Sequence, residues 1–449
     1  MKRLFILQTI IFVLLLKSTF SFAENFPKNN PLPDGVMYKG VNEDQWKTIK
    51  KIGDPLDCQK KLYNFQQVKD FKVVSPKDCE SDKNCIQNAL IKNDKVRLLE
   101  GKYEILKTIF LDNKILIGAE NGNTLIDAKN IPSKKGVNAI ILANSVIANL
   151  NIENSPDNGI SLISIISEGN YIAISKNKKD DLTKFKSKKS FSESVAKYDA
   201  LQRCKLFYNP YGEKMQNACF VEKIQFKTSS DNNDGSLVFR VKIGNSGVDG
   251  ESFSGKGVDI YGKNNRNHCL VSVEAYNGFN QTSTSLRKKS REKGGNADGF
   301  SIKHGPTNIT LIDTHAHHNS DDGYDFWGAG NEVIWSSLGK TKKDPIIRVF
   351  YSSALKNGKH PIGINGDGQG FKLGANSGKK YKTKDYGARL IYGSASCLNK
   401  HRGFDKNVSK AKMILLGNDS KKNKKNYEKL SNKKVKDDKY LLKCSMFFN

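Results

Sequence analysis

The chain contains 449 residues, with 74 Lys and Arg against 46 Asp and Glu, and carries a formal net charge of +28. Such a charge attracts polyanions at long range, and because the sequence contains no recognisable nucleic-acid module, an acidic polysaccharide is preferred over nucleic acid as partner. Lys, Asn and Ile are all abundant, so the coding bias of an AT-rich genome is an alternative source of the charge.

The N-terminus has the pattern of a secretory signal. Lys2 and Arg3 precede the apolar run "LFILQTIIFVLLL", which is short for a membrane span, and small residues follow at Ser21 and Ala23. We predict that residues 1–23 are cleaved on export, with an uncleaved membrane anchor as the alternative. The mature chain is then expected to be soluble, without a membrane span, and extracellular, or periplasmic as the second possibility.

The cysteines fit an oxidising destination, because they are scattered, with no CxxC motif and no Cys/His cluster of metal-ligand spacing. The pairs closest in sequence, and our candidate local disulfides, are Cys79 with Cys85 and Cys204 with Cys219. Buried thiols are the alternative. The other cysteines are Cys58, Cys269, Cys397 and Cys444.

Strand-like pieces of three to five residues recur along the chain, separated by Asn, Asp, Gly and Ser, as in "KTIFLDNKILIGAENGNTLIDA". Several of them share a weak repeat in which Gly precedes an alternating apolar and polar segment. The repeats are "DNGISL" at 157–162, "GKGVDI" at 255–260, "ADGFSI" at 297–302, "DDGYDF" at 321–326, "GQGFKL" at 368–373 and "HRGFDK" at 401–406. A spacing of about 24 residues, or twice that, is typical of a β-solenoid whose coils bury their apolar faces by stacking. We predict an all-β fold, a right-handed parallel β-helix.

The ends of such a solenoid must be covered, because they carry unpaired strand edges. We divide the mature chain into an N-terminal segment with a cap at 24–95, the catalytic β-helix at 96–418 and a Lys-rich C-terminal cap or tail at 419–449. "DKNCIQNALIK" at 82–92 has the apolar spacing of an amphipathic capping helix. Residues 174–235 fit the coil pattern least well, and "KNKKDDLTKFKSKKSFSES" within them is expected to be a solvated excursion.

Three carboxylates stand close together in "NSDDGYDFW", at Asp321, Asp322 and Asp325. They repel one another and are poor strand formers, so stability alone does not explain them. Asp298 lies about one coil earlier, and positions one coil apart are about 4.8 Å apart on the same face. Four converging oxygen donors predict a Ca²⁺ site, since Mg²⁺ would demand a stricter octahedron. A Ca²⁺ that only joins two coils is the alternative.

Lys372, in "GFKLG", follows about two repeat periods after these aspartates. A nearby bound cation would depress its pKa, and the neutral amine could then act as a general base. The alternative is one surface lysine among many.

Together these motifs resemble the family-nine polysaccharide lyases, which are calcium-dependent pectate lyases built on a right-handed parallel β-helix. The resemblance covers roughly residues 85–420. It rests on "GGNADGF" at 294–300, "NSDDGYDFW" at 319–327, "GDGQGFKLG" at 366–374 and "HRGFDKN" at 401–407. It implies that Asp298, Asp321, Asp322 and Asp325 bind calcium and that Lys372 is the catalytic base.

The reaction implied by the resemblance is β-elimination on a polygalacturonate-like polymer by a monomeric enzyme. Calcium would bridge the aspartates and a uronate carboxylate, Lys372 would remove the proton at C5, and the glycosidic bond at C4 would break. Arg402, in "HRGFDKN", is the candidate clamp for a substrate carboxylate, and an ion pair between coils is its alternative role. The chain departs from the family pattern at 174–250 and in "TSLRKKSREKGG", both beside the expected groove.

Two other functions remain as alternatives. Polygalacturonase-type hydrolases also carry a DD pair on a β-helix, but they need Gly-His-Gly and Arg-Ile-Lys segments in following coils, which this sequence lacks. A non-catalytic adhesin or polyanion-binding protein would keep calcium for rigidity. Pectate, another plant uronan and a glycosaminoglycan-like polymer all remain as substrates, cleaved internally or from an end.

Overall fold

The computed structural model describes most of the chain after residue 40. It describes residues 41–448 except for 54–57, 133–136, 163–169, 178–179, 187–218, 228–234, 248–254, 263–264, 281–294, 331, 338, 360–365, 375–384, 408, 429 and 436–437. The predicted signal segment and the predicted Cys204 to Cys219 pair therefore lie outside the description.

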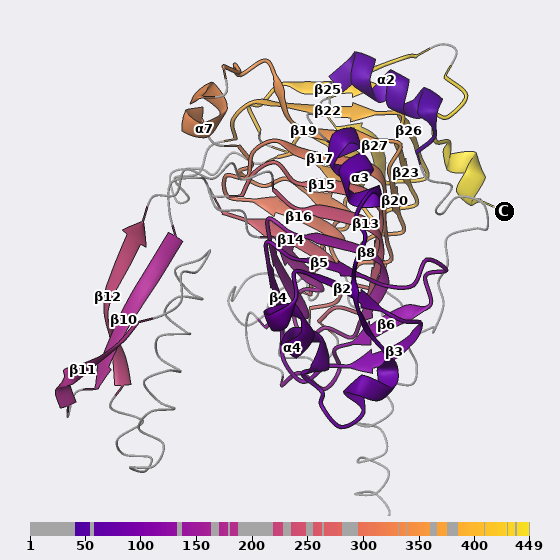
Figure 1. The fold of residues 1–449 in the computed structure, drawn as a ribbon. Coiled ribbons are helices and arrows are strands. Elements are labelled where there is room, and N and C mark those ends of the chain that lie inside the picture. The colour runs from indigo at the N-terminus through magenta and orange to yellow at the C-terminus, as the bar shows by residue number, and fades with distance from the viewer. Residues whose placement is uncertain are drawn as a thin grey trace, which may run out of the picture.

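Parallel strands stack coil upon coil along one axis, from β3 and β4 at the bottom of Figure 1 to β25 near the top. They form two sheets in the described residues. Sheet A, with 16 strands, contains β1 Lys72–Val74, β2 Lys95–Leu98, β3 Gly101–Glu104, β5 Ile115–Ile117, β6 Thr124–Asp127, β8 Val146–Glu153, β13 Leu237–Gly244, β15 Cys269–Tyr276, β17 Ile309–His317, β19 Pro345–Phe350, β20 Ser353–Leu355, β22 Ala388–Tyr392, β23 Ala395–Cys397, β25 Met413–Leu416, β26 Asp419–Lys421 and β28 Asn432–Lys433. Sheet B, with nine strands, contains β4 Ile109–Asp112, β7 Ile140–Ala143, β9 Ile160–Leu162, β14 Val258–Tyr261, β16 Phe300–Lys303, β18 Tyr324–Asp325, β21 Phe371–Lys372, β24 Arg402–Asp405 and β27 Lys425–Glu428. The predicted parallel β-helix is confirmed.

The glycine repeat found in the sequence marks the start of the sheet B strands. Gly299, Gly323 and Gly370 stand directly above one another, each just before its strand. A Cβ built on Gly299 would lie 2.8 Å from the carbonyl oxygen of Gly323, and one on Gly323 would lie 2.7 Å from that of Gly370. The repeat therefore needs glycine because successive backbones approach too closely for any side chain.

Inward positions of sheet B form an aromatic column in the core. Phe300, Tyr324, Phe371 and Phe404 stack with successive ring centroids 4.9, 4.3 and 4.8 Å apart and nearly parallel planes. All four are buried, with at most 1 % of their surface exposed. Such stacking adds to the large apolar area that each ring removes from water.

Long strands of sheet A bend at one aligned position. Asn149, Arg240, Ser272 and Asp313 all have left-handed backbones there, with φ of 55°, 51°, 53° and 53°. A later coil has Gly393 at this bend, with φ 59°. In the next coil the two halves of β17 pair with two separate strands, β19 and β20.

An asparagine ladder fixes the turn that leads from sheet A to sheet B. The side chains of Asn319, Asn357, Asn399 and Asn423 hydrogen-bond one to the next at 2.9, 3.0 and 3.0 Å. The last three also accept from the backbone N–H of the preceding member, as Asn357 Oδ1 does from Asn319 at 3.3 Å. Asn319 therefore fixes the start of the loop that carries the paired aspartates.

The N-terminal end of the stack is closed by the predicted amphipathic helix, α4 Cys85–Lys92. Ile86 and Leu90 on this helix are each only 1 % exposed and join the inner apolar core. The predicted disulfide between Cys79 and Cys85 joins α4 to the preceding 3₁₀ turn η1 Pro76–Cys79 and is confirmed.

Further segments cover the outside of sheet A (Figure 1). The helices α2 Glu43–Gly53 and α3 Cys58–Gln66 pack their apolar residues on it, and Cys58 forms a disulfide with Cys269 in β15. The C-terminal turn η3 Cys444–Phe447 packs on β20 and β23 and is tied to them by Cys397–Cys444. The coil strands continue to Lys433, and the apolar C-terminus lies along the side of the stack.

A separate antiparallel sheet is formed by β10 Asn170–Asn177, β11 Asp180–Lys186 and β12 Cys219–Lys227, in the order β11, β10, β12. It appears to the left of the coils in Figure 1. The region that fits the coil pattern least well is therefore not an irregular loop throughout, because its middle contains paired strands.

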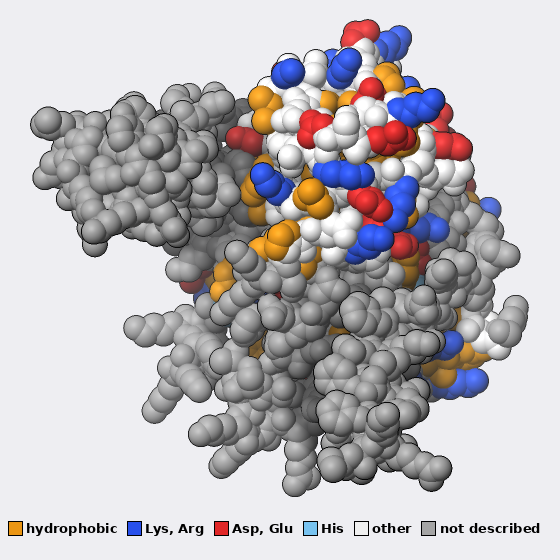
Figure 2. All heavy atoms as spheres, turned by 90° about the horizontal axis from the view of Figure 1, so that it is seen from below, with side chains coloured by type: hydrophobic (Ala, Val, Ile, Leu, Met, Phe, Trp, Pro, Cys, Tyr) orange, Lys and Arg blue, Asp and Glu red, His pale blue; other side chains and the backbone are white. Residues whose placement is uncertain are grey.

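The view from below in Figure 2 shows described Lys and Arg side chains interspersed with Asp and Glu around the N-terminal end. Within the described residues, every helix is too short or too polar to span a bilayer.

Candidate functional site

Buried carboxylates gather where the coils enter sheet B. Asp298 precedes β16, Asp321 and Asp322 precede β18, and each of these three offers an oxygen within 4.8 Å of the others. These three aspartates have only 0 to 6 % of their surface exposed. Asp325 lies in β18 itself and is 3 % exposed. The structure thus brings together Asp298, Asp321 and Asp322, with Asp298 one coil before the other two as expected, and Asp325 is linked to them through Lys303 and Lys372.

Lys372 lies closer to this cluster than its sequence distance predicted. It pairs directly with Asp325, because β18 and β21 are adjacent strands one coil apart and not two. The coil between them is long because the helix α7 Glu332–Ser337 is inserted before β19 and β20, which take the place that β17 has in the preceding coil. The expectation of two periods was wrong because an insertion doubles the residue count without adding a coil.

Lys372 contacts three carboxylates. Its Nζ lies 2.9 Å from Asp322 Oδ2 and 3.7 Å from both Asp325 Oδ2 and Asp367 Oδ2. The same Nζ lies 5.7 Å from the ring centre of Trp327. One lysine therefore connects residues of two neighbouring coils.

Backbone donors hold two of the aspartates in place. Asp321 accepts hydrogen bonds from the N–H groups of Asn296 at 2.6 Å and Asp367 at 3.0 Å. Asp322 Oδ1 accepts from the N–H of Gln369 at 2.7 Å. These donors belong to the preceding and following coils, so the stacking of coils itself orients the carboxylates.

Lys303, at the end of β16, was missed in the sequence. Its Nζ lies 2.8 Å from Asp298 Oδ2 and 2.7 Å from Asp325 Oδ2, and the residue is 8 % exposed. Strand alternation could have found it, because Lys303 is two residues beyond Ser301, which is in register with Asp325.

Asp367 is the second residue missed, although it lies inside the quoted "GDGQGFKLG". Its Oδ2 accepts a hydrogen bond from Gln369 Nε2 at 2.9 Å. Burial raises its pKa, but Lys372 and hydrogen bonds outweigh that effect and hold the pKa below its usual range.

The protein's own charges set the protonation of the cluster. Burial, and then the charge of Asp367, raise the pKa of Asp321 and Asp322 well above the ordinary carboxyl value. Burial lowers the pKa of Lys372, but the surrounding carboxylates, Asp322 first, outweigh it and raise this pKa well above the usual range. The predicted depression of the lysine pKa thus requires an added cation.

The donor set fits a hard metal ion. Every donor is a carboxylate oxygen, and the buried Asp325 Oδ1 has no hydrogen-bond partner among the described residues. Lys303 and Lys372 contact the Oδ2 atoms of Asp298, Asp322 and Asp325. The aspartates form a buried cluster that could bind a metal ion, in which two ammonium groups compete for the same carboxylates.

Arg402, the predicted substrate clamp, is engaged within the protein. Its Nη1 lies 2.9 Å from Asp405 Oδ2, and its Nε lies 3.9 Å from Glu428 Oε2. Asp405 is in register with Lys372 on the neighbouring strand. The structure shows the ion pair that was the alternative role, and the clamp stays a prediction.

Fold and site together define a right-handed parallel β-helix protein with a buried acidic cluster on one sheet. Residues 213–438, half of the chain, match the family model described as "Pel9A-like, right handed beta helix region". The chain therefore belongs to this Pel9A-like β-helix family.

Solved structures that superpose on this one include pectate lyase Pel9A, with a TM-score of 0.49 and 16 % sequence identity, over 81 % of this chain and 73 % of that one. The A-module of the mannuronan C-5 epimerase AlgE6 from Azotobacter vinelandii is similar with a TM-score of 0.42 and 13 % identity, over 80 % and 72 % of the two chains. PfbA, a surface adhesin of Streptococcus pneumoniae, has a TM-score of 0.32 and 10 % identity, over 79 % and 76 %. A search of the curated proteins found no match.

Proposed function

We propose that this protein is an exported polysaccharide lyase that cleaves a pectate-like polyuronate by calcium-assisted β-elimination. The observation that carries the proposal is the contact of Lys372 with Asp322 and Asp325, which joins a potential base to a carboxylate cluster across two adjacent coils. Family membership and the motif resemblance support the same reaction class. The three described disulfides support an oxidising destination outside the cytoplasm.

The aspartates at 298, 321, 322 and 325 would hold the calcium ion. When bound, this ion supplies positive charge that attracts a uronate carboxylate and acidifies the neighbouring C5 proton. The backbone donors to Asp321 and Asp322 keep these carboxylates oriented without rearrangement. Lys303 and Lys372 would give up part of their contact with the same oxygens.

Lys372 is the proposed base. In its neutral form, Nζ accepts the C5 proton, the C5–H electron pair forms a C4=C5 double bond, and the C4–O bond breaks. The leaving oxygen takes a proton, which gives a new chain end and an unsaturated sugar. Arg402, on the adjacent strand β24, would bind a substrate carboxylate once its ion pair with Asp405 is broken.

The test measures ultraviolet absorbance of the unsaturated product from polygalacturonate with calcium. Lys372→Met and Lys372→Arg should both lose about 10²- to 10⁴-fold in turnover, because neither side chain can accept the proton. Lys102→Met is the matched control, since Lys102 forms a 2.8 Å ion pair with Asp127 on distant N-terminal coils. Near-parental turnover by Lys372→Arg would overturn the base assignment.

A further inference from the structure

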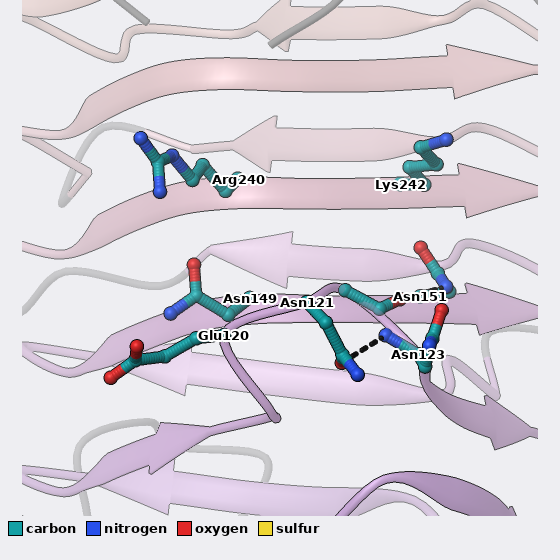
Figure 3. Close-up of a pocket in the computed structure, with 8 residues that line it drawn as sticks. Glu120, Asn121, Asn123, Asn149, Asn151, Arg240 and Lys242 are labelled. Carbon is teal, nitrogen blue, oxygen red and sulfur yellow. Dashed lines mark hydrogen bonds between the residues drawn. The ribbon is translucent and has the colours of Figure 1, made fainter.

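A polar pocket of about 410 Å³ lies on the outer face of sheet A, away from the aspartate cluster (Figure 3). Its size is within the range of small-ligand pockets. It is lined by Glu120, Asn121, Gly122, Asn123, Asn149, Asn151, Arg240 and Lys242. Side-chain amides and two cations thus dominate its wall.

The lining residues are held by strand register and by their own hydrogen bonds. Asn151 on β8 is in register with Lys242 on β13, and Asn149 stands beside Arg240 at the bend. Asn151 Nδ2 donates to the carbonyl of Gly122 at 2.8 Å, which fixes the loop against the sheet. The wall is therefore formed before any ligand arrives.

Arg240 occupies a backbone conformation that favours glycine. Its φ is 51°, which is uncommon for a non-glycine residue, and Gly393 has the equivalent bend position in a later coil. The side chain is exposed and lies over the ring of Phe239, 5.0 Å from its centre. In the described part of the chain, no carboxylate forms an ion pair with this guanidinium.

We propose that this pocket is an accessory binding site for an acidic sugar, one or two residues long. A guanidinium recognises a carboxylate through two parallel hydrogen bonds, and side-chain amides both donate to and accept from sugar hydroxyls. Glu120 adds an acceptor for a hydroxyl, a contact that a small anion without hydroxyl groups cannot make. The acidic-sugar chemistry follows from the pocket, whereas naming a uronate rests on the proposed function.

The test uses calorimetry on full-length Lys372→Met protein in EDTA, with di- to tetragalacturonate as ligand. Binding should survive chelation and should weaken at least tenfold when Arg240→Gly is added, while the melting temperature stays equal or rises because glycine suits the bend. Lys422→Gly is the matched control, since Lys422 is also exposed with φ 57° on a C-terminal coil, and it should bind within twofold of the parent. The proposal is overturned if no binding is detected in EDTA, or if Arg240→Gly leaves the binding unchanged.

Two further ligands test the chemistry. A neutral oligosaccharide of equal length should bind at least tenfold more weakly than the galacturonate, and so should inorganic sulfate. Sulfate binding as tight as that of the galacturonate would overturn the sugar assignment and leave an anion site only.

Failure here and failure of the proposed function give different results. If no uronan is cleaved but EDTA-resistant, Arg240-dependent binding is present, the lyase proposal fails and the accessory site stands. If cleavage occurs as expected and this binding is absent, the accessory site fails alone.

Discussion

Inward and outward positions of the sheet B strands carry opposite chemistry although they are adjacent in sequence. The inward residues Tyr324 and Phe371 stack in the aromatic column. The next residues, Asp325 and Lys372, are also in register with each other, but they form part of a charged network. Because side chains alternate along a strand, one residue separates a position that stabilises the coil from one that can perform chemistry.

The largest effect is expected when the inward column is broken. Phe371→Ala should lower the free energy of unfolding by about 3–5 kcal/mol, because it removes a buried ring and leaves a cavity between two stacked neighbours. Denaturant unfolding should show this loss equally with calcium and with EDTA. A loss that calcium restores would mean that the aromatic column and the charged network of Asp325 and Lys372 are not independent.

A buried polar group outside the aromatic column and the charged network should produce a smaller, pH-dependent effect on stability. His268 is fully buried, accepts a hydrogen bond from the N–H of Ser236 at 3.0 Å, and has its pKa lowered to about 3 by burial. Because the unfolded chain binds a proton near pH 6.5 and the folded one does not, stability should fall as the pH drops from about 6.5 toward 3.

At pH 5 this loss should be about 2 kcal/mol relative to pH 7. His268→Gln should remove that part of the pH dependence, measured by denaturant midpoints across the range. An unchanged acid slope in the variant would contradict the assignment of this histidine as a buried neutral group.

Removing Lys303, a lysine of the charged network, should produce a smaller free-energy change than the two above, and it should appear in metal affinity. Lys303→Met leaves Asp298 and Asp325 without one ammonium, so a divalent cation should bind about tenfold more tightly, or about 1.4 kcal/mol. Titration calorimetry with calcium measures this directly. Equal or weaker affinity would show that Lys303 does not compete with the ion.

The sequence predicted the features that depend on local periodicity. The glycine repeat identified the sheet B strands β9, β14, β16, β18 and β21, because close backbone approach leaves a glycine just before each of them. Counting from Gly299 to Gly323 then places Asp298 one coil before Asp322. The helix α4 was also predictable, because its apolar spacing differs from that of a strand.

Features that depend on insertions or distant contacts could not be predicted. The coil number of Lys372 was misjudged because α7 lengthens one coil. The disulfide between Cys58 and Cys269 spans 211 residues, so no local pattern indicates it. The contacts of Lys303 with Asp325 and of Arg402 with Glu428 run between neighbouring coils, so they follow only once the register of sheet B is known.

The most direct test of the account is the mass of the products that purified protein releases from a defined oligogalacturonate with calcium. β-Elimination predicts two fragments whose masses add up to that of the substrate, one of them absorbing in the ultraviolet, and no product after EDTA treatment. Fragments that together gain one water, formed equally well in EDTA, would contradict a calcium-assisted lyase and indicate hydrolysis.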